Sequence, residues 1–149
     1  MEKTRNYKSY CPQYLGLDVF GDKWTLLIIR DMMIDGKRHF REFLQSEEKI
    51  ASNILTNRLN MLEAEGIVTR HGDQSHKQKI IYSLTQKGID LFPIIMAIAE
   101  WSVNYQPVDK EKAERAKKII DGGPETQKEI MSALKKQHLG DSYWPGDKG

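Results

Sequence analysis

The sequence predicts a mainly α fold with a small β-hairpin (α+β), and three observations support this. Residues 12–20, 23–34 and 52–65 have the apolar spacing of helices, with a shorter helical segment between the last two. Two short runs that alternate like strands follow, and a polar loop containing Gly72 separates them. A long segment with apolar residues at helical spacing comes next.

The first helices are expected to differ in burial. Residues 12–20 form a short helix that Gly21 ends. Residues 23–34 are apolar on most sides, so this helix should lie near the centre of the core. A turn at residues 35–38 then leads into a short helix that aromatic residues such as Phe43 anchor.

The helix over residues 52–65 has two contrasting faces. Ser52 is its expected N-cap, and Gly66 stands where a helix commonly ends. Leucines fall on one side of this helix, and polar residues fall on the opposite side. The polar residues are Asn53, Thr56, Asn57 and Asn60. Such a stripe is typical either of a solvated face or of a helix that reads DNA bases.

A long helix should follow the hairpin. Thr85 is its expected N-cap, and residues 86–106 give it a broad apolar face. Pro93 lies too far inside to be the first helical residue, so we expect a kink there or a break just before it. Beyond Pro107 the chain is more charged, and residues 109–139 predict two surface helices.

The order of helix, short helix, connector, helix and hairpin is that of a winged helix-turn-helix. We expect residues 1–106 to form a DNA-binding domain of this fold with a long C-terminal dimerisation helix. Residues 107–149 should add a charged helical C-terminal extension. A helix fits the major groove of B-DNA, and Asn and Thr can contact base edges there. Residues 52–65 are therefore the candidate recognition helix, and residues 71–79 are the candidate wing on the DNA backbone.

The sequence offers candidates for both kinds of DNA contact. The base contacts would come from Asn53, Thr56, Asn57 and Asn60. Lysine and arginine bind phosphates and fix the register of a protein on DNA. The backbone contacts would come from Arg38, Arg41, Arg58, Arg70, Lys77 and Lys79, with Lys37, His71 and His76 as further candidates. Arg58 lies beside the apolar arc of its helix. Its side chain could therefore either lie over the core in a structural role or bind a phosphate.

Composition narrows the class of protein. A chain of 149 residues, 39% of them hydrophobic, suits one domain with an appendage. The net charge is only +2, so binding to an anion must depend on local placement of charge. A single cysteine allows no intrachain disulfide. We see no signal peptide and no apolar run that would span a membrane, and we expect a soluble, cytoplasmic protein.

The sequence contains none of the common catalytic or phosphate-binding motifs. We therefore expect no enzyme, no catalytic residue, no metal and no cofactor. His71, Asp73 and His76 fit a polar wing better than a metal site. The alternative to DNA binding is a winged-helix module that docks a protein, and its affinity would depend less steeply on salt than binding to DNA.

Four stretches of the chain resemble the HxlR-type winged helix-turn-helix transcriptional regulators. They are CPQYLGLDVFGDKWTLLIIRDM, DGKRHFREFLQS, IASNILTNRLNMLEAEGIVTR and IIYSLTQKGIDLFPIIMAIAEW, and they span about residues 10–105. The resemblance implies a transcription regulator that binds double-stranded operator DNA, an inverted repeat, as a homodimer.

The same resemblance implies that the first helix and the long helix pack against the partner subunit. The implied interface residues are Leu15, Leu91, Ile94, Ile95, Ile98, Trp101 and Tyr105. The long helix also has more apolar surface than a small core needs, which agrees with this interface. The alternative is that residues 109–139 fold back and cover that surface.

The chain departs from the family pattern at its C-terminus, where residues 107–149 extend past the usual end. This extension would widen the dimer interface, bind a small-molecule effector of unknown class, or form solvated helices.

Cys11 is the candidate redox sensor, because some members of the family use a cysteine at this position to sense oxidants or electrophiles. Lys3, Arg5 and Lys8 are close in sequence, and positive charge favours the reactive thiolate. Without a second cysteine, sensing requires an intersubunit disulfide, a mixed disulfide or alkylation. The alternative is a small buried residue before a helix.

Overall fold

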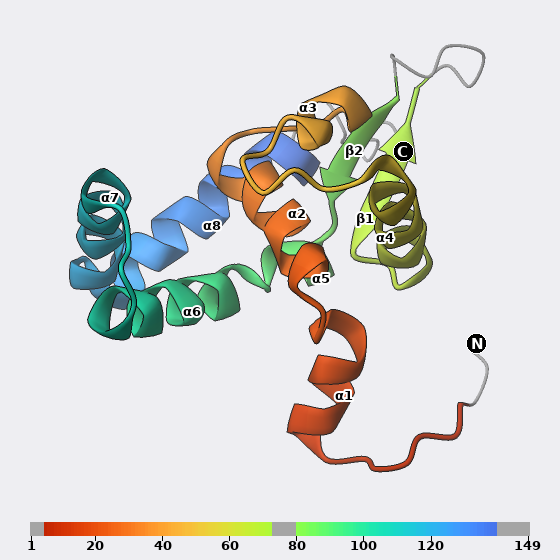
Figure 1. Ribbon diagram of the computed structural model, residues 1–149, viewed down its shortest axis with the longest axis horizontal. Coiled ribbons are helices and arrows are strands. Elements are labelled where there is room, and N and C mark those ends of the chain that lie inside the picture. Colours follow the sequence, from red (N-terminus) through yellow and green to blue (C-terminus); the bar gives the residue numbers. More distant parts are fainter. Residues whose placement is uncertain (1–4, 73–79, 140–149) are drawn as a thin grey trace.

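Helices surround one two-stranded antiparallel hairpin in the computed structural model, which describes residues 5–72 and 80–139 (Figure 1). The elements in chain order are α1 (Pro12–Phe20), α2 (Lys23–Ile34), α3 (Phe40–Leu44), α4 (Ser52–Ala64), β1 (Val68–His71), β2 (Ile81–Leu84), α5 (Gln86–Ile89), α6 (Phe92–Tyr105), α7 (Lys110–Asp121) and α8 (Gly123–Leu139). The expected fold class, mainly α with a small hairpin, is confirmed. No helix in the described ranges is long and apolar enough to cross a membrane.

Local capping explains where several helices begin and end. Asp22 caps α2, because its carboxylate accepts a hydrogen bond from the amide of Thr25. Gly66 follows α4 with a φ of +75°, a left-handed conformation that favours glycine. The expected N-cap at Ser52 was wrong by one residue. The carbonyl of Ala51 already accepts the amide of Leu55 at 2.9 Å, so Ala51 is the cap.

Pro93 divides the segment expected to be one long helix. Thr85 is the N-cap of α5, as expected, and its side chain accepts a hydrogen bond from the amide of Gly88. That helix ends at Ile89, and α6 begins at Phe92 with Pro93 in its first turn. Proline has no amide hydrogen, so it cannot continue the helical bonding of α5. The expected break just before Pro93 is confirmed.

The core lies between α2, α4, the hairpin and the start of α6. Leu55, Leu59 and Leu62 are buried on one face of α4, as the leucine spacing predicted. Ile29 and Met32 from α2 are fully buried. Helix α1 has no buried residue and extends from the rest of the chain at the end opposite the hairpin (Figure 1).

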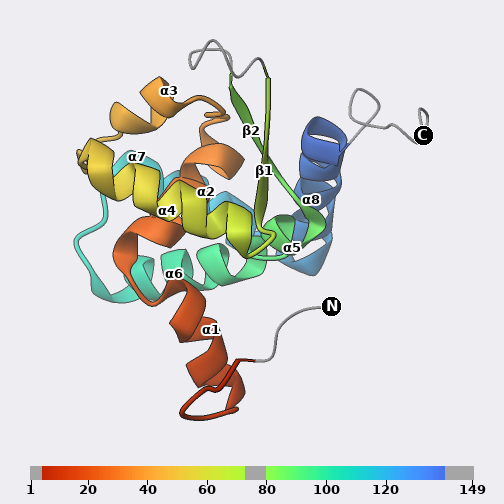
Figure 2. The ribbon, with the colours of Figure 1, turned by 90° about the vertical axis from the view of Figure 1, so that its right-hand side faces the viewer.

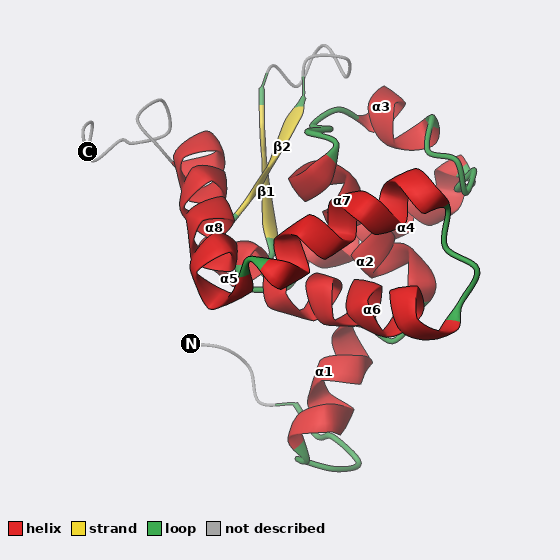
Figure 3. Ribbon diagram, turned by 90° about the vertical axis from the view of Figure 1, so that its left-hand side faces the viewer, coloured by secondary structure: helices red, strands yellow, loops and turns green. Residues whose placement is uncertain are grey.

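The extension was expected to consist of two surface helices, and α8 corrects that expectation. Leu134 and His138 of α8 are each only 2% exposed. This helix packs against α5 and β2, and Figures 2 and 3 show it beside the hairpin. The reason is that these two side chains, one helical turn apart, face the sheet rather than solvent. The division of the chain between residues 106 and 107 stays a prediction.

Candidate nucleic-acid interface

The outward face of α4 brings the predicted base-contact residues together. Asn53, Thr56, Asn57 and Asn60 are all exposed, while the leucines of the same helix are buried. The helical period explains this separation, because residues three and four apart share a face. The result is a continuous polar surface of amide and hydroxyl groups, and its role in reading bases stays a prediction.

A groove of about 990 Å³ lies between α3, α4 and the hairpin. Its lining is His39, Phe40, Arg41, Glu42, Thr56, Leu59, Asn60, Arg70, Ile80 and Tyr82. Arg41 and Arg70 are exposed, and neither has an ion-pair partner among residues 5–72 and 80–139. Two arginines that pair with no carboxylate of the described residues, on a groove beside α4, are suited to binding phosphate oxygens.

Arg38 requires a correction to the predicted phosphate contacts. Its Nε donates to the carbonyl of Tyr82 at 2.7 Å, and its Nη2 donates to the hydroxyl of Ser83 at 2.6 Å. The side chain is half-buried, and burial lowers the pKa of its guanidinium. Its hydrogen-bonding groups are therefore directed at β2, and we assign Arg38 to support of the hairpin.

The structure gives Arg58 internal partners, which favours the structural alternative for this residue. Its Nη1 donates to the Asp22 carboxylate at 3.2 Å, which joins α4 to the cap of α2. Its Nη2 donates to the side-chain carbonyl of Asn57 at 2.6 Å. Arg58 thereby orients a predicted base-contact residue. Asp22 was not predicted to lie near this face, and its position as the residue before α2 was the signal available.

The remaining predicted phosphate contacts are divided between described and undescribed residues. Lys77 and Lys79 lie outside the described residues, as does His76. Lys37 is directed inward, with its Nζ 3.6 Å from the Asp31 carboxylate and 3.2 Å from the Ser46 hydroxyl. His71 is exposed on β1, and its Nε2 lies 2.9 Å from the hydroxyl of Thr69.

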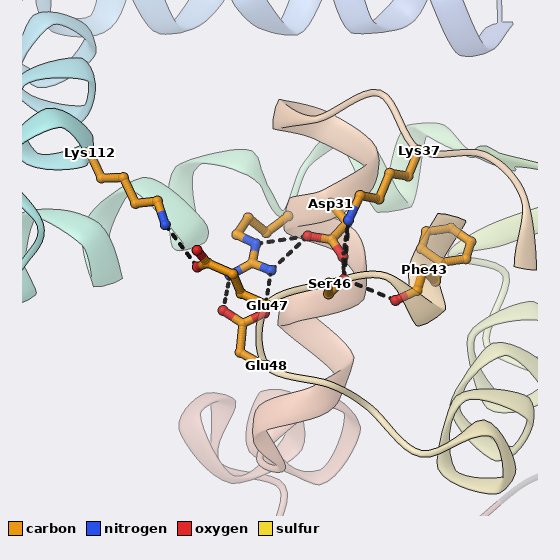
Figure 4. A network of polar contacts seen from close by, with 8 residues as sticks. Asp31, Lys37, Phe43, Ser46, Glu47, Glu48 and Lys112 are labelled. Atoms are coloured by element: carbon orange, nitrogen blue, oxygen red, sulfur yellow. Dashed lines mark hydrogen bonds and ion pairs between the residues drawn. The ribbon is translucent and has the colours of Figure 1, made fainter. Parts of the chain in front are cut away.

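A polar network fixes the turn that precedes α4 (Figure 4). Arg30 donates two hydrogen bonds of 2.9 Å to Glu48, and its Nη2 lies 2.7 Å from the buried carboxylate of Asp31. The bonds from Arg30 lower the pKa of Glu48 to about 2. Asp31 also accepts a hydrogen bond from Ser46. These groups therefore join α2 to the turn that leads into α4.

The extension reaches the same turn through α7. Lys112 of α7 forms an ion pair of 2.9 Å with Glu47, next to the Arg30 network (Figure 4). Both side chains are at least half exposed, so this pair adds little stability. It nevertheless places the extension beside the turn before α4.

Cys11 is exposed, which excludes the buried alternative considered for this residue. It is the N-cap of α1, and its Sγ lies 3.2 Å from the side-chain carbonyl of Gln13. Arg5, a predicted positive neighbour, forms an ion pair of 3.1 Å with Glu65. The thiol is accessible to solutes, and one of the three positive charges that the sequence offered, Arg5, is already paired.

The residues expected at a dimer interface differ in exposure. Leu91 and Ile95 are each only 8% exposed within the single chain, so we correct their assignment to core residues. Leu91 and Ile95 are four residues apart, so they share the face that packs into the core. Leu15 and Ile94 are half-buried, while Ile98, Trp101 and Tyr105 are 51%, 56% and 71% exposed. Helices α6 and α7 are in contact, yet these last three side chains remain uncovered.

Residues 19–110 match the family described as HxlR-like helix-turn-helix. The uncharacterised HTH-type transcriptional regulator YdeP of Bacillus subtilis is 36% identical over 106 residues, which cover 70% of this chain and 82% of YdeP. Two solved structures are also similar. The redox regulator HypR in its reduced form is 40% identical with a TM-score of 0.55, and the alignment covers 62% of this chain and 90% of HypR.

The second structure is the reduced form of the transcriptional regulator YodB from Bacillus subtilis. It is 30% identical with a TM-score of 0.54, and the alignment covers 68% of this chain and all of YodB (100%). The family match includes the hairpin, α4 and the groove, and it extends through α6. The chain therefore belongs to the HxlR-like helix-turn-helix family of DNA-binding transcriptional regulators.

Proposed function

We propose that this regulator binds an inverted-repeat operator as a homodimer, with α4 of each subunit in the major groove. The exposed Asn and Thr side chains of α4 are the observation that carries this proposal. An asparagine amide can donate to and accept from the edge of an adenine, and threonine can contact polar edges or the thymine methyl group. The buried leucines on one face of α4 hold the helix to the core, and the polar residues on its opposite face would contact the DNA.

The phosphate contacts that fix α4 in register are proposed to come from Arg41 and Arg70. Both guanidinium groups are exposed on the groove between α3, α4 and the hairpin. Since neither has an ion-pair partner among the described residues, binding a phosphate breaks no existing ion pair of theirs. Contacts of this kind release counterions from DNA and make the affinity fall steeply with salt.

The homodimer is proposed to form through α1 and α6. Helix α1 buries none of its residues within the single chain, although several are apolar, and Leu17 is 59% exposed. Ile98, Trp101 and Tyr105 add a second exposed apolar surface on α6. Large apolar side chains that are exposed together are typical of an interface. Two-fold symmetry would place two α4 helices about one DNA turn apart or a multiple of it.

Cys11 is proposed to make the regulator responsive to oxidants or electrophiles. Its side chain is exposed at the start of α1, which belongs to the proposed dimer surface. The similar protein HypR is a redox regulator. A change at the Cys11 sulfur would alter the packing of α1 against the partner and so the distance between the two α4 helices.

A gel-shift experiment on the DNA upstream of the protein's own gene tests the operator proposal. We expect a discrete complex at physiological salt that survives an excess of random competitor. Asn57→Ala should reduce the preference for operator over random DNA about tenfold, since one bidentate base contact contributes about 1–3 kcal/mol. Arg70→Ala should weaken binding to both DNAs by a similar factor, because phosphates carry no sequence information.

Asn6→Ala is the matched control, because Asn6 is an exposed asparagine outside α4. It should leave both affinities unchanged. If Asn57→Ala weakened operator and random DNA equally, Asn57 would have no role in base recognition. If no upstream complex formed, selection from random DNA would identify any other operator. If the affinity for the selected DNA fell only weakly with salt, the result would favour the protein-docking alternative.

A further inference from the structure

The edge of β2 that does not pair with β1 is bound by two side chains from distant parts of the sequence. Alternate residues of a strand direct their backbone groups to opposite edges. The amide of Thr85 donates to Ile67 on the β1 side, whereas the amide of Tyr82 donates to the carbonyl of Arg38 at 2.8 Å on the other side. Arg38 then donates back to the carbonyl of Tyr82.

His138 of α8 provides the next partner along that edge. Its Nδ1 accepts the amide hydrogen of Leu84 at 2.9 Å, so the proton of the neutral ring is on Nε2. The imidazole is buried, and Leu134 one turn earlier is buried as well. Arg38 and His138 therefore satisfy the groups of β2 that a third strand would otherwise bind.

His138 lies outside the region shared with the family, whereas its partner Leu84 lies inside it. The family match ends at residue 110, where α7 begins, and α8 follows from Gly123. The same extension contacts the turn before α4 through Lys112 and Glu47 (Figure 4). The extension thus contacts the turn before α4 through α7 and strand β2, which lines the groove with Tyr82, through α8.

The hairpin needs such support because two strands alone form a marginal sheet in water. Arg70 of β1 is the register partner of Tyr82 on β2, so a shift of β2 moves Arg70 with it. The side chain of Tyr82 lines the groove together with Arg70. The position of one proposed phosphate contact therefore depends on what holds the outer edge of β2.

We propose that His138 is a positioning residue for DNA binding, which holds the hairpin at the angle where Arg70 reaches a phosphate. The inference rests on the proposed function, since it needs the hairpin to contact DNA. His138 itself touches no DNA in this arrangement. It acts through the amide of Leu84, and the C-terminal extension is part of the DNA-binding unit.

The test compares His138→Ala with His138→Asn in the full chain. The asparagine carbonyl can replace Nδ1 as acceptor for the Leu84 amide, whereas alanine removes the acceptor. The probe is random-sequence duplex DNA, and the affinity is measured over a range of salt concentrations. We expect His138→Ala to bind severalfold more weakly, with a salt slope shallower by about one, the value of one phosphate contact. His138→Asn should retain most of both quantities.

Two further variants separate positioning from loss of stability. Met96→Ala removes a buried side chain of α6 away from β2, and it should destabilise the fold without changing the salt slope. In an Arg70→Ala background, His138→Ala should have little further effect on affinity. Hydrogen exchange of the Leu84 amide, measured without DNA and compared with the other slow amides of the same protein, should accelerate selectively in His138→Ala and only in step with those amides in Met96→Ala.

Each result decides the inference. The positioning role of His138 would be overturned by an unchanged salt slope in His138→Ala. It would also be overturned if His138→Ala weakened DNA affinity equally in the wild-type and Arg70→Ala backgrounds. Neither result would contradict DNA binding by the wild-type chain. A wild-type chain that binds no DNA would overturn the proposed function, and the role of His138 in it. In that case the exchange rate at Leu84 would still report whether His138 holds the edge of β2.

Discussion

Arg58 follows Asn57 on the outer part of α4, and its guanidinium turns back toward α2. It bridges the carboxylate of Asp22 and the side-chain carbonyl of Asn57. An arginine on a recognition helix is commonly assigned to phosphate, yet here it contacts Asp22 and the neighbouring Asn57. The residue type was compatible with both roles, and only the position of Asp22 distinguishes them.

Substitution of Cys11 tests the proposed sensing at a single sulfur. Because the chain has one cysteine, Cys11→Ser removes every thiol that diamide can oxidise. We expect diamide to change the operator affinity of the wild-type protein and to leave that of Cys11→Ser unaltered. Gel shifts with and without diamide measure this, and non-reducing gels show whether the product is an intersubunit disulfide. The proposal fails if diamide alters both proteins equally.

At the scale of elements, α8 is held to β2 by a contact that depends on pH. Burial, together with the nearby positive charge of Arg38, lowers the pKa of His138 from 6.5 to about 4. The unfolded chain therefore binds a proton at His138 between these pH values while the folded chain does not. The contribution of the neutral His138 to the free energy of unfolding is fully present above pH 6.5. It decreases as the pH falls below 6.5 and is lost once the pH has fallen through the pKa of the folded state.

Urea unfolding near neutral pH and at mildly acidic pH checks this linkage. We expect the wild-type free energy of unfolding to fall by up to about 3 kcal/mol between the two pKa values of His138, the equivalent of that shift. His138→Asn does not titrate and should lose less stability over the same range. Equal losses in the two proteins would show that other groups dominate the acid sensitivity.

The turn before α4 shows how burial decides the strength of two similar ion pairs. Arg30 and Glu48 share two hydrogen bonds next to the buried Asp31, whereas Lys112 and Glu47 meet in solvent. Solvent and salt weaken an exposed pair, so the Arg30 pair is the one that fixes the turn. The sequence lists these charges without indicating which of them are shielded.

At the scale of the whole molecule, the exposed apolar residues of α1 and α6 predict the oligomeric state. Trp101 is 56% exposed, and its ring centroid lies 5.4 Å from that of Tyr105. Trp101→Glu would place a charge in the proposed interface, where desolvation disfavours it. We expect sedimentation analysis to give a dimer for the wild-type chain and a folded monomer for Trp101→Glu.

Ile81→Glu is the matched control for that experiment. Ile81 is an apolar residue of β2 that is 38% exposed, and it lies on the hairpin rather than on α1 or α6. It should stay dimeric, because only the charge at the interface opposes association. A Trp101→Glu protein that sediments as a dimer would exclude this part of α6 from the interface.

The sequence predicted the order of elements because local rules decide it. Helical spacing, the cap at Thr85 and the glycine at position 66 act within a few residues of the chain. The effect of Pro93 is local as well, because a residue without an amide hydrogen cannot continue a helix, and the break lies just before α6. The exposed stripe on α4 followed from the same periodicity.

The tertiary structure alone decided the partners of the charged and polar side chains. Arg38 is 44 residues from Tyr82, and His138 is 54 residues from Leu84, yet each pair shares a hydrogen bond. No periodic pattern encodes such distances, because they depend on how α8 and the turn after α2 fold against β2. The sequence by itself therefore determined which face of α4 is exposed. The long-range packing determined which arginines are bound to other parts of the chain and that α8 packs on the hairpin.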